Sequence, residues 1–343
     1  MFPPSEALLT ETLRQNGRLT AGEVVSVAVT PASQPATMST LLNLEIGYSP
    51  DAEGDVPDRC LMKVVEPAQF PIGRSEVEFY RFAAASPGDG LVDCYGTRID
   101  EEGQTAFILL EERRGPFVQT EWPIPSGFEA CRRAVEAIGR FHAAWWESDE
   151  AHRIGQYRQL PQADPERLNP RMAKLFDTLG DALSPTRRAL IEHLVADYPT
   201  LHAERLNDAG RRTIVHGDAH LWNFLIPTDA SRPPVLIDWQ LWGVDYAAAD
   251  LAYMMALHWF PERRARFERD LVRVWVDTMQ ANGVRYAFDD AWSDYRFLVA
   301  GLLLRVVVYS TVIPASIWWP HLERAFLAFE DLACAELIGD GSR

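Results

Sequence analysis

Cysteine is scarce in this sequence of 343 residues: only four are present, and no two of them form a CxxC pair. A disulfide framework and a zinc site are therefore not expected, and free thiols fit a cytoplasmic location. Basic residues are also few, with 33 lysines and arginines against 49 aspartates and glutamates, which gives a net charge of −16. Because so acidic a surface repels a phosphate backbone, nucleic acid is not expected as a partner.

Signals for secretion and for the membrane are weak or missing. The N-terminus lacks a basic segment followed by an apolar run, so no signal peptide is expected. The most apolar stretch, residues 297–319, contains Arg305 and is interrupted by Pro314. A central charge and a proline both disfavour a membrane-spanning helix, so we interpret this stretch as a buried core helix and expect no membrane insertion.

Three common catalytic motifs are absent as well. The sequence has no GxSxG segment, no HExxH segment and no GxGxxG segment after a strand-like run. These absences argue against α/β-hydrolase, zinc-protease and dinucleotide-binding chemistry. The overall composition, 47% apolar and 24% charged, is that of an ordinary globular protein with a substantial core.

The apolar pattern changes in character near residue 112. Before that point, strand-like runs at 23–29, 40–46, 60–65 and 105–110 surround one helical segment at 74–85. After it, apolar residues recur at helical spacing. We therefore predict an α+β fold with two lobes, a small β-rich lobe at 1–112 and a larger helical lobe at 113–343, with a ligand cleft between them.

One passage in the second part, residues 213–240, carries a pattern of oxygen-bearing side chains. Two short apolar runs, NFLIP and PVLID, are separated by the turn-rich segment TDASRP and predict a β-hairpin. Asn223 opens the first run and Asp238 closes the second, so antiparallel pairing would bring them side by side. Asp218 precedes Asn223 by five residues, and three such oxygen ligands at one edge suit Mg²⁺.

The same residues follow the spacing of a kinase catalytic loop. His216-Gly217-Asp218 and Asn223 form an HGDxxxxN motif, and the IDWQ segment at Asp238 takes the place of DFG. With these motifs and FHAAWW, the sequence resembles the aminoglycoside phosphotransferase and choline kinase-like superfamily, and most of all its ecdysteroid-kinase-like small-molecule kinases. The resemblance implies a bilobal protein-kinase-like fold with a nucleotide-binding N-terminal lobe, and ATP and Mg²⁺ as cofactors.

The resemblance also implies roles for individual residues. Asp218 is the expected catalytic base that takes the proton of the acceptor hydroxyl, and Asn223 and Asp238 are the expected Mg²⁺ ligands. Lys63, the only lysine in the first 170 residues, is expected to bind the α- and β-phosphates, with a helix glutamate holding its ammonium. Glu76 is favoured for this glutamate by its E-x-x-F-Y spacing.

Some alternatives to these roles stay open. Glu78 is the rival to Glu76 as the partner of the lysine. His216 is interpreted as a residue that braces the catalytic loop, and the alternative is a second base. Asp250, on the helix that follows, is expected to accept hydrogen bonds from the loop.

The nucleotide-binding residues are harder to assign. The segment between the first two strands, TPASQPATMS, contains no glycine, so backbone amides together with the hydroxyls of Ser33 and Ser39 are expected to contact the phosphates. The strand at 105–110 is expected to lead into the hinge. Leu109, Leu110 and Glu111 are therefore expected to line the adenine pocket, Glu111 through its backbone.

The acceptor is expected to be a hydroxyl group of a small molecule. Only eleven residues separate Asp238 from Asp250, too few for the activation segment that docks a peptide. The apolar C-terminal segment VVVYSTVIPASIWW favours a hydrophobic or amphipathic alcohol, with an aminoglycoside, macrolide or choline-type acceptor as the alternative. A non-catalytic pseudokinase that only binds ligands is disfavoured because Lys63, Asp218 and both expected metal ligands are present.

Four residues are candidates for contact with the acceptor. His220 lies inside the catalytic loop, Trp242 follows IDWQ, and Trp318 and Trp319 lie in the C-terminal apolar segment. The competing interpretation makes the histidine a surface residue and the tryptophans part of the core.

Overall fold

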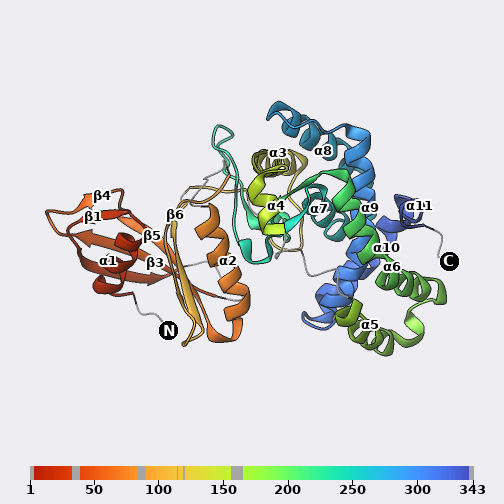
Figure 1. Cartoon of the computed structure of the whole chain (residues 1–343), viewed down its shortest axis with the longest axis horizontal. Helices are drawn as coiled ribbons and strands as arrows, with labels where there is room; N and C mark the ends of the chain where they lie inside the picture. Colours follow the sequence, from red (N-terminus) through yellow and green to blue (C-terminus); the bar gives the residue numbers. More distant parts are fainter. Residues whose placement is uncertain are drawn as a thin grey trace. The chain divides into compact units, whose positions relative to one another are not determined.

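The computed structural model describes residues 4–32, 39–83, 90–113, 115–118, 120–155 and 165–339. It divides into two compact units, one formed by residues 1–117 and 235–241 and the other by residues 118–234 and 242–343. The first unit contains most of the β-structure and the second is mainly helical (Figure 1). The predicted α+β fold of two lobes is confirmed.

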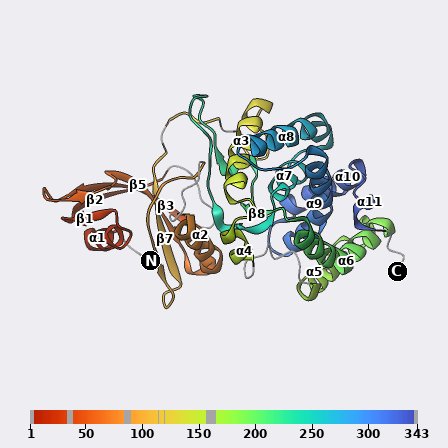
Figure 2. The same cartoon turned by 45° about the horizontal axis from the view of Figure 1, so that its top comes forward.

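The first unit is built on a five-stranded antiparallel sheet with the strand order β2-β3-β5-β7-β6. Its strands are β2 (Val24–Pro31), β3 (Ser39–Tyr48), β5 (Arg59–Val65), β6 (Cys94–Asp100) and β7 (Thr105–Glu111), and the short strands β1 (Leu19–Ala21) and β4 (Glu53–Gly54) pair separately. Helices α1 (Glu6–Gln15) and α2 (Phe70–Ala83) lie on either side of β7 in Figure 2.

Alternation along β5 assigns its side chains to the two faces of the sheet. Met62 and Val64 join a core cluster that includes Leu9 and Leu13 of α1. Because successive side chains of a strand point to opposite faces, Lys63 faces away from this cluster. It faces α2, and this places a lysine where a helix can supply its counter-ion.

Helix α2 approaches β5 closely because Gly73 has no side chain. A Cβ atom at this position would lie 2.3 Å from a methyl carbon of Val65, well inside contact distance. Glu76 lies one turn further along α2, so the close contact at Gly73 brings its carboxylate within reach of β5.

A short distant segment, Val235–Leu241, completes the first unit. It contains β10 (Val235–Leu236), and the backbone N–H of Leu236 donates to the carbonyl oxygen of Gly90 at 2.9 Å. The indole of Trp239 stacks on the ring of Phe79 with centroids 3.9 Å apart, and Ser75 Oγ donates to the carbonyl oxygen of Gln240 at 2.6 Å. Helix α2 therefore fixes the conformation of the IDWQ segment.

The second unit consists mainly of helices. They are α3 (Phe128–Trp145), α4 (Asp149–Gly155), α5 (Pro165–Leu179), α6 (Pro185–Ala209), α7 (Ala248–Ala252), α8 (Pro261–Ala281), α9 (Phe288–Tyr309), α10 (Ala315–Asp331) and α11 (Ala335–Ile338). Its strands are β8 (Arg212–Val215), β9 (Phe224–Leu225) and β11 (Gly243–Tyr246), and β8 pairs antiparallel with β11. A π-helical turn, Tyr253–Leu257, continues α7.

The apolar stretch that we interpreted as one core helix forms the second half of α9 and the start of α10. Helix α9 ends at Tyr309, and Pro314 caps the start of α10. Most of α9 is buried, including Arg305. No helix in the described part of the chain is long and apolar enough to span a membrane.

Candidate active site

Lys63 is buried in the first unit and lies between two carboxylates. Its Nζ atom is 2.7 Å from Oε2 of Glu76 and also forms an ion pair with Oδ1 of Asp238. Burial alone would lower the pKa of the ammonium, but the two carboxylates raise that pKa above its usual value. Lys63 is therefore charged at neutral pH and is held by two ion pairs, which suits the phosphate-binding role predicted for it.

The structure distinguishes the two glutamates of α2. Glu76 is fully buried against Lys63, whereas Glu78 forms an ion pair with Arg74 at 3.1 Å near the surface. Helical geometry explains the difference, because residues two apart point to different sides of a helix. The pairing with Lys63 therefore belongs to the glutamate that the E-x-x-F-Y spacing favoured.

Asp238 has a left-handed backbone conformation, with a φ angle of 63°. Aspartate is among the few non-glycine residues that occur there with some frequency. Its side chain is 45% exposed, and Oδ1 of its carboxylate pairs with Lys63. An accessible carboxylate beside a fixed ammonium suits a residue that binds a phosphate-bound metal ion.

The residues expected around the adenine fall on different faces of the sheet. Leu109 belongs to the core cluster on the α1 side, so its side chain cannot line a pocket on the Lys63 side. Leu110 pairs with Leu61, which lies two residues before Lys63 and shares its face. The backbone N–H of Glu111 already donates to the carbonyl oxygen of Asp93 at 2.8 Å.

The expected phosphate-loop residues are only partly within the described structure. Ser39 is the first residue of β3 and pairs with Val65 at the end of β5. Ser33 lies outside the described residues. The hydroxyl of Ser39 is thus near one end of the strand that carries Lys63, and its contact with a nucleotide remains a prediction.

In the second unit, the HGD segment forms a tight loop after β8. Gly217 has a φ angle of 77°, which a residue with a side chain rarely adopts. The carboxylate of Asp250 accepts hydrogen bonds from the backbone N–H groups of His216 at 2.7 Å and Gly217 at 2.9 Å. Nδ1 of His216 accepts from the backbone N–H of Asp218 at 3.2 Å, which fits the interpretation of this histidine as a brace.

Asp250 is itself held by His142 of α3. The indole N–H of Trp275 donates to Nδ1 of His142 at 3.2 Å, so Nε2 carries the proton and donates to Asp250 at 3.1 Å. Burial alone would raise the pKa of Asp250, but the hydrogen bonds from His142 and His216 keep that pKa below its usual value. The loop is therefore anchored on a charged carboxylate.

Asn223 lies beside Asp218, as the motif spacing predicts. Its Nδ2 donates to the carbonyl oxygen of Asp218 at 2.9 Å and to Oδ2 of Asp218 at 3.2 Å. These bonds orient the amide so that its oxygen, for which no hydrogen bond occurs within the described residues, is available to a ligand. Amide and carboxylate oxygens are the ligands that Mg²⁺ prefers, so Asn223 fits the role of a metal ligand.

The other oxygen of Asp218 is held by Tyr253, which in turn contacts Tyr309. The hydroxyl of Tyr253 donates to Oδ1 of Asp218 at 2.5 Å and lies 2.8 Å from the hydroxyl of Tyr309. Arg305 donates through Nε to the oxygen of Tyr309 at 3.0 Å and through Nη2 to the carbonyl oxygen of Gly217 at 2.6 Å. The charged arginine fixes the hydroxyls, so Oδ1 of Asp218 is held by Tyr253 while Oδ2 accepts from Asn223.

A group of aromatic and imidazole rings surrounds this carboxylate on the same unit. We call it the histidine–tyrosine cluster, and it comprises His220, Tyr253, His258, Tyr309 and His321. The ring centroids are 5.3 Å apart for His220 and His258 and 4.8 Å apart for His258 and His321. His220, a predicted acceptor contact, also lies near Asp218, with 3.8 Å between Nε2 and Oδ2.

The three tryptophans predicted to contact the acceptor differ in exposure. Trp242 and Trp318 are buried, whereas Trp319 is 37% exposed. Trp318 contacts Trp319 edge to face with ring centroids 6.1 Å apart. His321, one turn further along α10, is the residue of this segment that joins the histidine–tyrosine cluster.

Several residues of this site were not foreseen from the sequence. Arg305 gave a signal, because a lone charge inside an apolar run must be paired or functional when the run is buried. Tyr253 and Tyr309 gave none, since tyrosines occur throughout helical cores. His258 and His321 come together only through the packing of the π-helical turn against α10.

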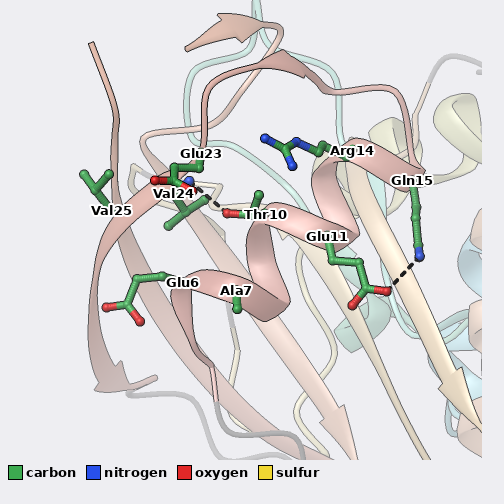
Figure 3. A pocket seen from close by; sticks show the side chains of 9 residues that line it. All are labelled: Glu6, Ala7, Thr10, Glu11, Arg14, Gln15, Glu23, Val24 and Val25. Atoms are coloured by element: carbon green, nitrogen blue, oxygen red, sulfur yellow. Dashed lines mark hydrogen bonds between the residues drawn. The ribbon is translucent and has the colours of Figure 1, made fainter. Parts of the chain in front are cut away.

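A separate hollow of about 700 Å³ lies on the first unit, between α1 and the start of β2 (Figure 3). The backbone N–H of Val24 donates to Oγ1 of Thr10 at 2.9 Å, and Gln15 donates to Glu11 at 3.1 Å along the helix. Lys63, Glu76 and Asp238 are not among its lining residues. The hollow is thus distinct from the group around Lys63.

Comparison with known proteins agrees with this geometry. No curated protein matches the sequence. The fold is shared with solved structures of low identity, including a candidate aminoglycoside phosphotransferase from Ralstonia eutropha (TM-score 0.58, 17% identity, 97% of this chain and 99% of that one). A choline kinase from Cryptosporidium parvum shares it as well (TM-score 0.56, 13% identity, 90% and 88% covered).

A spectinomycin phosphotransferase solved with ADP and spectinomycin also has this fold (TM-score 0.50, 11% identity, 97% of this chain and 100% of that one). The profile of a protein family described as the phosphotransferase enzyme family matches residues 54–286, more than half of the sequence. That range contains Lys63, Glu76, Asp218, Asn223 and Asp238. The chain therefore belongs to the phosphotransferase enzyme family.

Proposed function

We propose that this phosphotransferase is an ATP- and Mg²⁺-dependent kinase that phosphorylates a hydroxyl group of a hydrophobic or amphipathic alcohol. The observation that carries the proposal is the buried ion pair of Lys63 and Glu76, 2.7 Å apart, with Asp238 as a second partner. Burying an ammonium between two carboxylates is costly to stability, and such an arrangement is the one that kinases use to bind ATP phosphates.

The residues of the second unit support the transfer step. Asp218 accepts the proton of the acceptor hydroxyl through Oδ2 while Tyr253 holds Oδ1. The hydroxyl oxygen forms a bond to the γ-phosphorus, the bond between that phosphorus and the β–γ bridging oxygen breaks, and ADP leaves. Asn223 and Asp238 are the residues that would hold Mg²⁺, which would neutralise the charge of the phosphate oxygens.

ATP as the donor is supported by the spectinomycin phosphotransferase of the same fold, which was solved with ADP. We propose that the nucleotide-binding lobe ends near residue 112, at the end of β7 (Thr105–Glu111). The IDWQ segment, which lies later in the sequence, also belongs to this lobe. The location proposed for the protein is the cytoplasm, where ATP is abundant.

The test is an ATP-consumption assay against panels of alcohols, sterols, macrolides, aminoglycosides and choline, with phosphorylated product identified by mass spectrometry. We expect turnover with one alcohol class and a loss of several orders of magnitude in Asp218→Asn, with ATP binding retained. A wild-type protein that binds ATP and phosphorylates no member of any panel would support the pseudokinase alternative.

A further inference from the structure

Arg324 of α10 is a buried arginine with no acidic partner among the described residues. It is 7% exposed, and its Nε atom has no hydrogen-bond acceptor within that part of the chain. The other two buried arginines among the described residues have hydrogen-bond acceptors: Arg264 lies 3.0 Å from Glu268, and Arg305 donates to Tyr309 and to the carbonyl oxygen of Gly217. A buried charge without a counter-ion is costly to stability, so we infer that a bound molecule supplies the counter-ion of Arg324.

The neighbours of Arg324 do not satisfy it. Its guanidinium stacks on the ring of Phe260 at 4.2 Å and lies 3.4 Å from Nδ1 of His321. That Nδ1 is also 2.9 Å from the carbonyl oxygen of Leu257, to which it must donate its proton. A protonated nitrogen cannot accept from the arginine, so His321 does not supply an acceptor, and the buried Nε of Arg324 has none among the described residues.

Electrostatics gives the same result. Burial lowers the pKa of Arg324, and no carboxylate compensates for that effect. The pKa of His321 is lowered to about 4, chiefly by burial and to a smaller extent by the positive charge of Arg324. The histidine is therefore neutral at physiological pH, and the arginine remains the positive charge at this end of the cluster.

The position of Arg324 relates it to the catalytic aspartate within one unit. The histidine–tyrosine cluster runs from Asp218, through His220 and His258, to His321. Arg324 lies at the far end of this row, beside His321. Asp218 and Arg324 therefore lie at opposite ends of one row of ring contacts.

We propose that the acceptor carries an acidic group, a carboxylate or a phosphate, which binds the guanidinium of Arg324 while its hydroxyl meets Asp218. The planar fork of an arginine matches both kinds of anion through paired hydrogen bonds. The inference rests on the proposed kinase function and defines its acceptor as an anionic amphipathic alcohol. It argues against a polycationic acceptor, since this group of residues contains two arginines, Arg305 near Asp218 and Arg324 beside His321, and a single carboxylate.

The first test measures binding without turnover. Three matched series are compared by thermal shift and calorimetry: hydroxybutyrate, hydroxyhexanoate and hydroxyoctanoate with terminal hydroxyls, the corresponding diols, and the corresponding amino alcohols. Hydroxyalkyl phosphates of the same lengths distinguish a carboxylate from a phosphate as the anion. We expect the acids or the phosphates to bind and stabilise the wild-type protein, and the diols and amino alcohols of equal length to have no effect.

Arg324→Met supplies the decisive variant, with Arg187→Met as its control. Arg187 pairs with Glu323, the residue before Arg324, at 2.9 Å, and stacks on Phe326, so its loss disturbs the same helix without touching the proposed anion site. Arg324→Met should weaken binding of the acid by roughly thirtyfold or more, because a charge-paired anion loses its partner. Its melting temperature should stay equal to or rise above that of wild type, since an unpaired buried charge has been removed.

The outcomes separate this inference from the kinase proposal. Acid binding that disappears in Arg324→Met but not in Arg187→Met supports the inference, even if no phosphorylation of these probes follows. Phosphorylation of neutral or cationic alcohols, unchanged in Arg324→Met, would overturn the inference and leave the kinase function intact. A lower melting temperature in Arg324→Met with unaltered acid binding assigns the arginine a purely structural role and also overturns it, and so does the failure of every anionic probe to bind wild type.

Discussion

The two carboxylates proposed to carry the chemistry are each oriented by a neighbouring side chain whose own position is fixed by burial. Tyr253 orients Asp218, and Lys63 orients Asp238. Burial raises the pKa of Tyr253 well above its usual value. The tyrosine hydroxyl therefore stays protonated at physiological pH and donates a hydrogen bond to Asp218. The hydrogen bond from Tyr253 thereby fixes the orientation of the Asp218 carboxylate.

Tyr253→Phe tests this orientation. We expect kcat to fall about tenfold or more, because a hydrogen bond to a charged group contributes roughly 1.5–3 kcal/mol. The KM for ATP should not change, since Tyr253 contacts the base and not the nucleotide. Tyr198→Phe is the control: its hydroxyl donates to the carbonyl oxygen of Phe297 at 3.2 Å, away from Asp218, so kcat should stay near wild type. Equal kcat values in both variants would remove Tyr253 from the mechanism.

Glu76→Gln tests the partner of Lys63. The amide cannot balance the ammonium, which then depends on Asp238 alone, so the KM for ATP should rise about tenfold or more. Glu78→Gln is the matched control on the same helix, because Glu78 pairs with Arg74 at the surface and exposed pairs contribute little. If Glu78→Gln raised the KM for ATP and Glu76→Gln did not, the assignment of the two glutamates would have to be reversed.

At the scale of elements, the predictable parts were those with a regular apolar period. The predicted strand at 60–65 matches β5 (Arg59–Val65), because its residues are buried on both faces and the run is short. Strand β6 (Cys94–Asp100) was missed, because most of its residues are only partly buried and no alternation marks the sequence CYGTRID. The contact of His258 with His321 was equally hidden, since it depends on how two helices pack.

In helix α10, too, the sequence did not reveal which side chains are buried by helix packing. The two tryptophans of this helix can be tested by mutation. Trp318 is buried and Trp319 is 37% exposed, so Trp318→Ala should lower the free energy of unfolding by about 3–5 kcal/mol and Trp319→Ala by less than about 1 kcal/mol. Denaturant unfolding measures both values. The KM of the acceptor, measured alongside, decides the proposed pocket role: a stability loss without any change in that KM would end it.

At the scale of the whole molecule, buried imidazoles make stability depend on pH. The pKa of His321 falls to about 4, from 6.5 in its ordinary state, chiefly because of burial, and burial lowers the pKa of His258 as well. Below pH 6.5 His321 binds a proton in the unfolded chain but not in the folded chain. The stability should therefore fall as the pH drops from 6.5 towards 4. The groups that face His321 are Arg324, His258, His220, Tyr309 and Asp218.

His202 changes the stability in the opposite direction to His321 as the pH varies, so it does not contribute to the loss of stability at acid pH. Burial alone would lower its pKa, but Asp245 raises it above the usual value, so its stabilising contribution is complete below pH 6.5 and is lost only as the pH rises. Denaturant melts at a series of pH values should therefore show a decline below pH 6.5 that His321→Gln reduces by about 2–3 kcal/mol at pH 4. An equally steep decline in that variant would contradict the assignment.

The contribution of Val235–Leu241 to the first unit has a consequence for building hybrid enzymes. A recombinant that exchanged residues 1–117 with those of a relative would place a foreign α2 opposite the native Trp239, and the stacking with Phe79 would be lost. The heptapeptide must be transplanted with the N-terminal unit, although more than a hundred residues of the other unit separate them in the gene. An active hybrid should thus need three junctions, near residues 117, 234 and 241, instead of a single one.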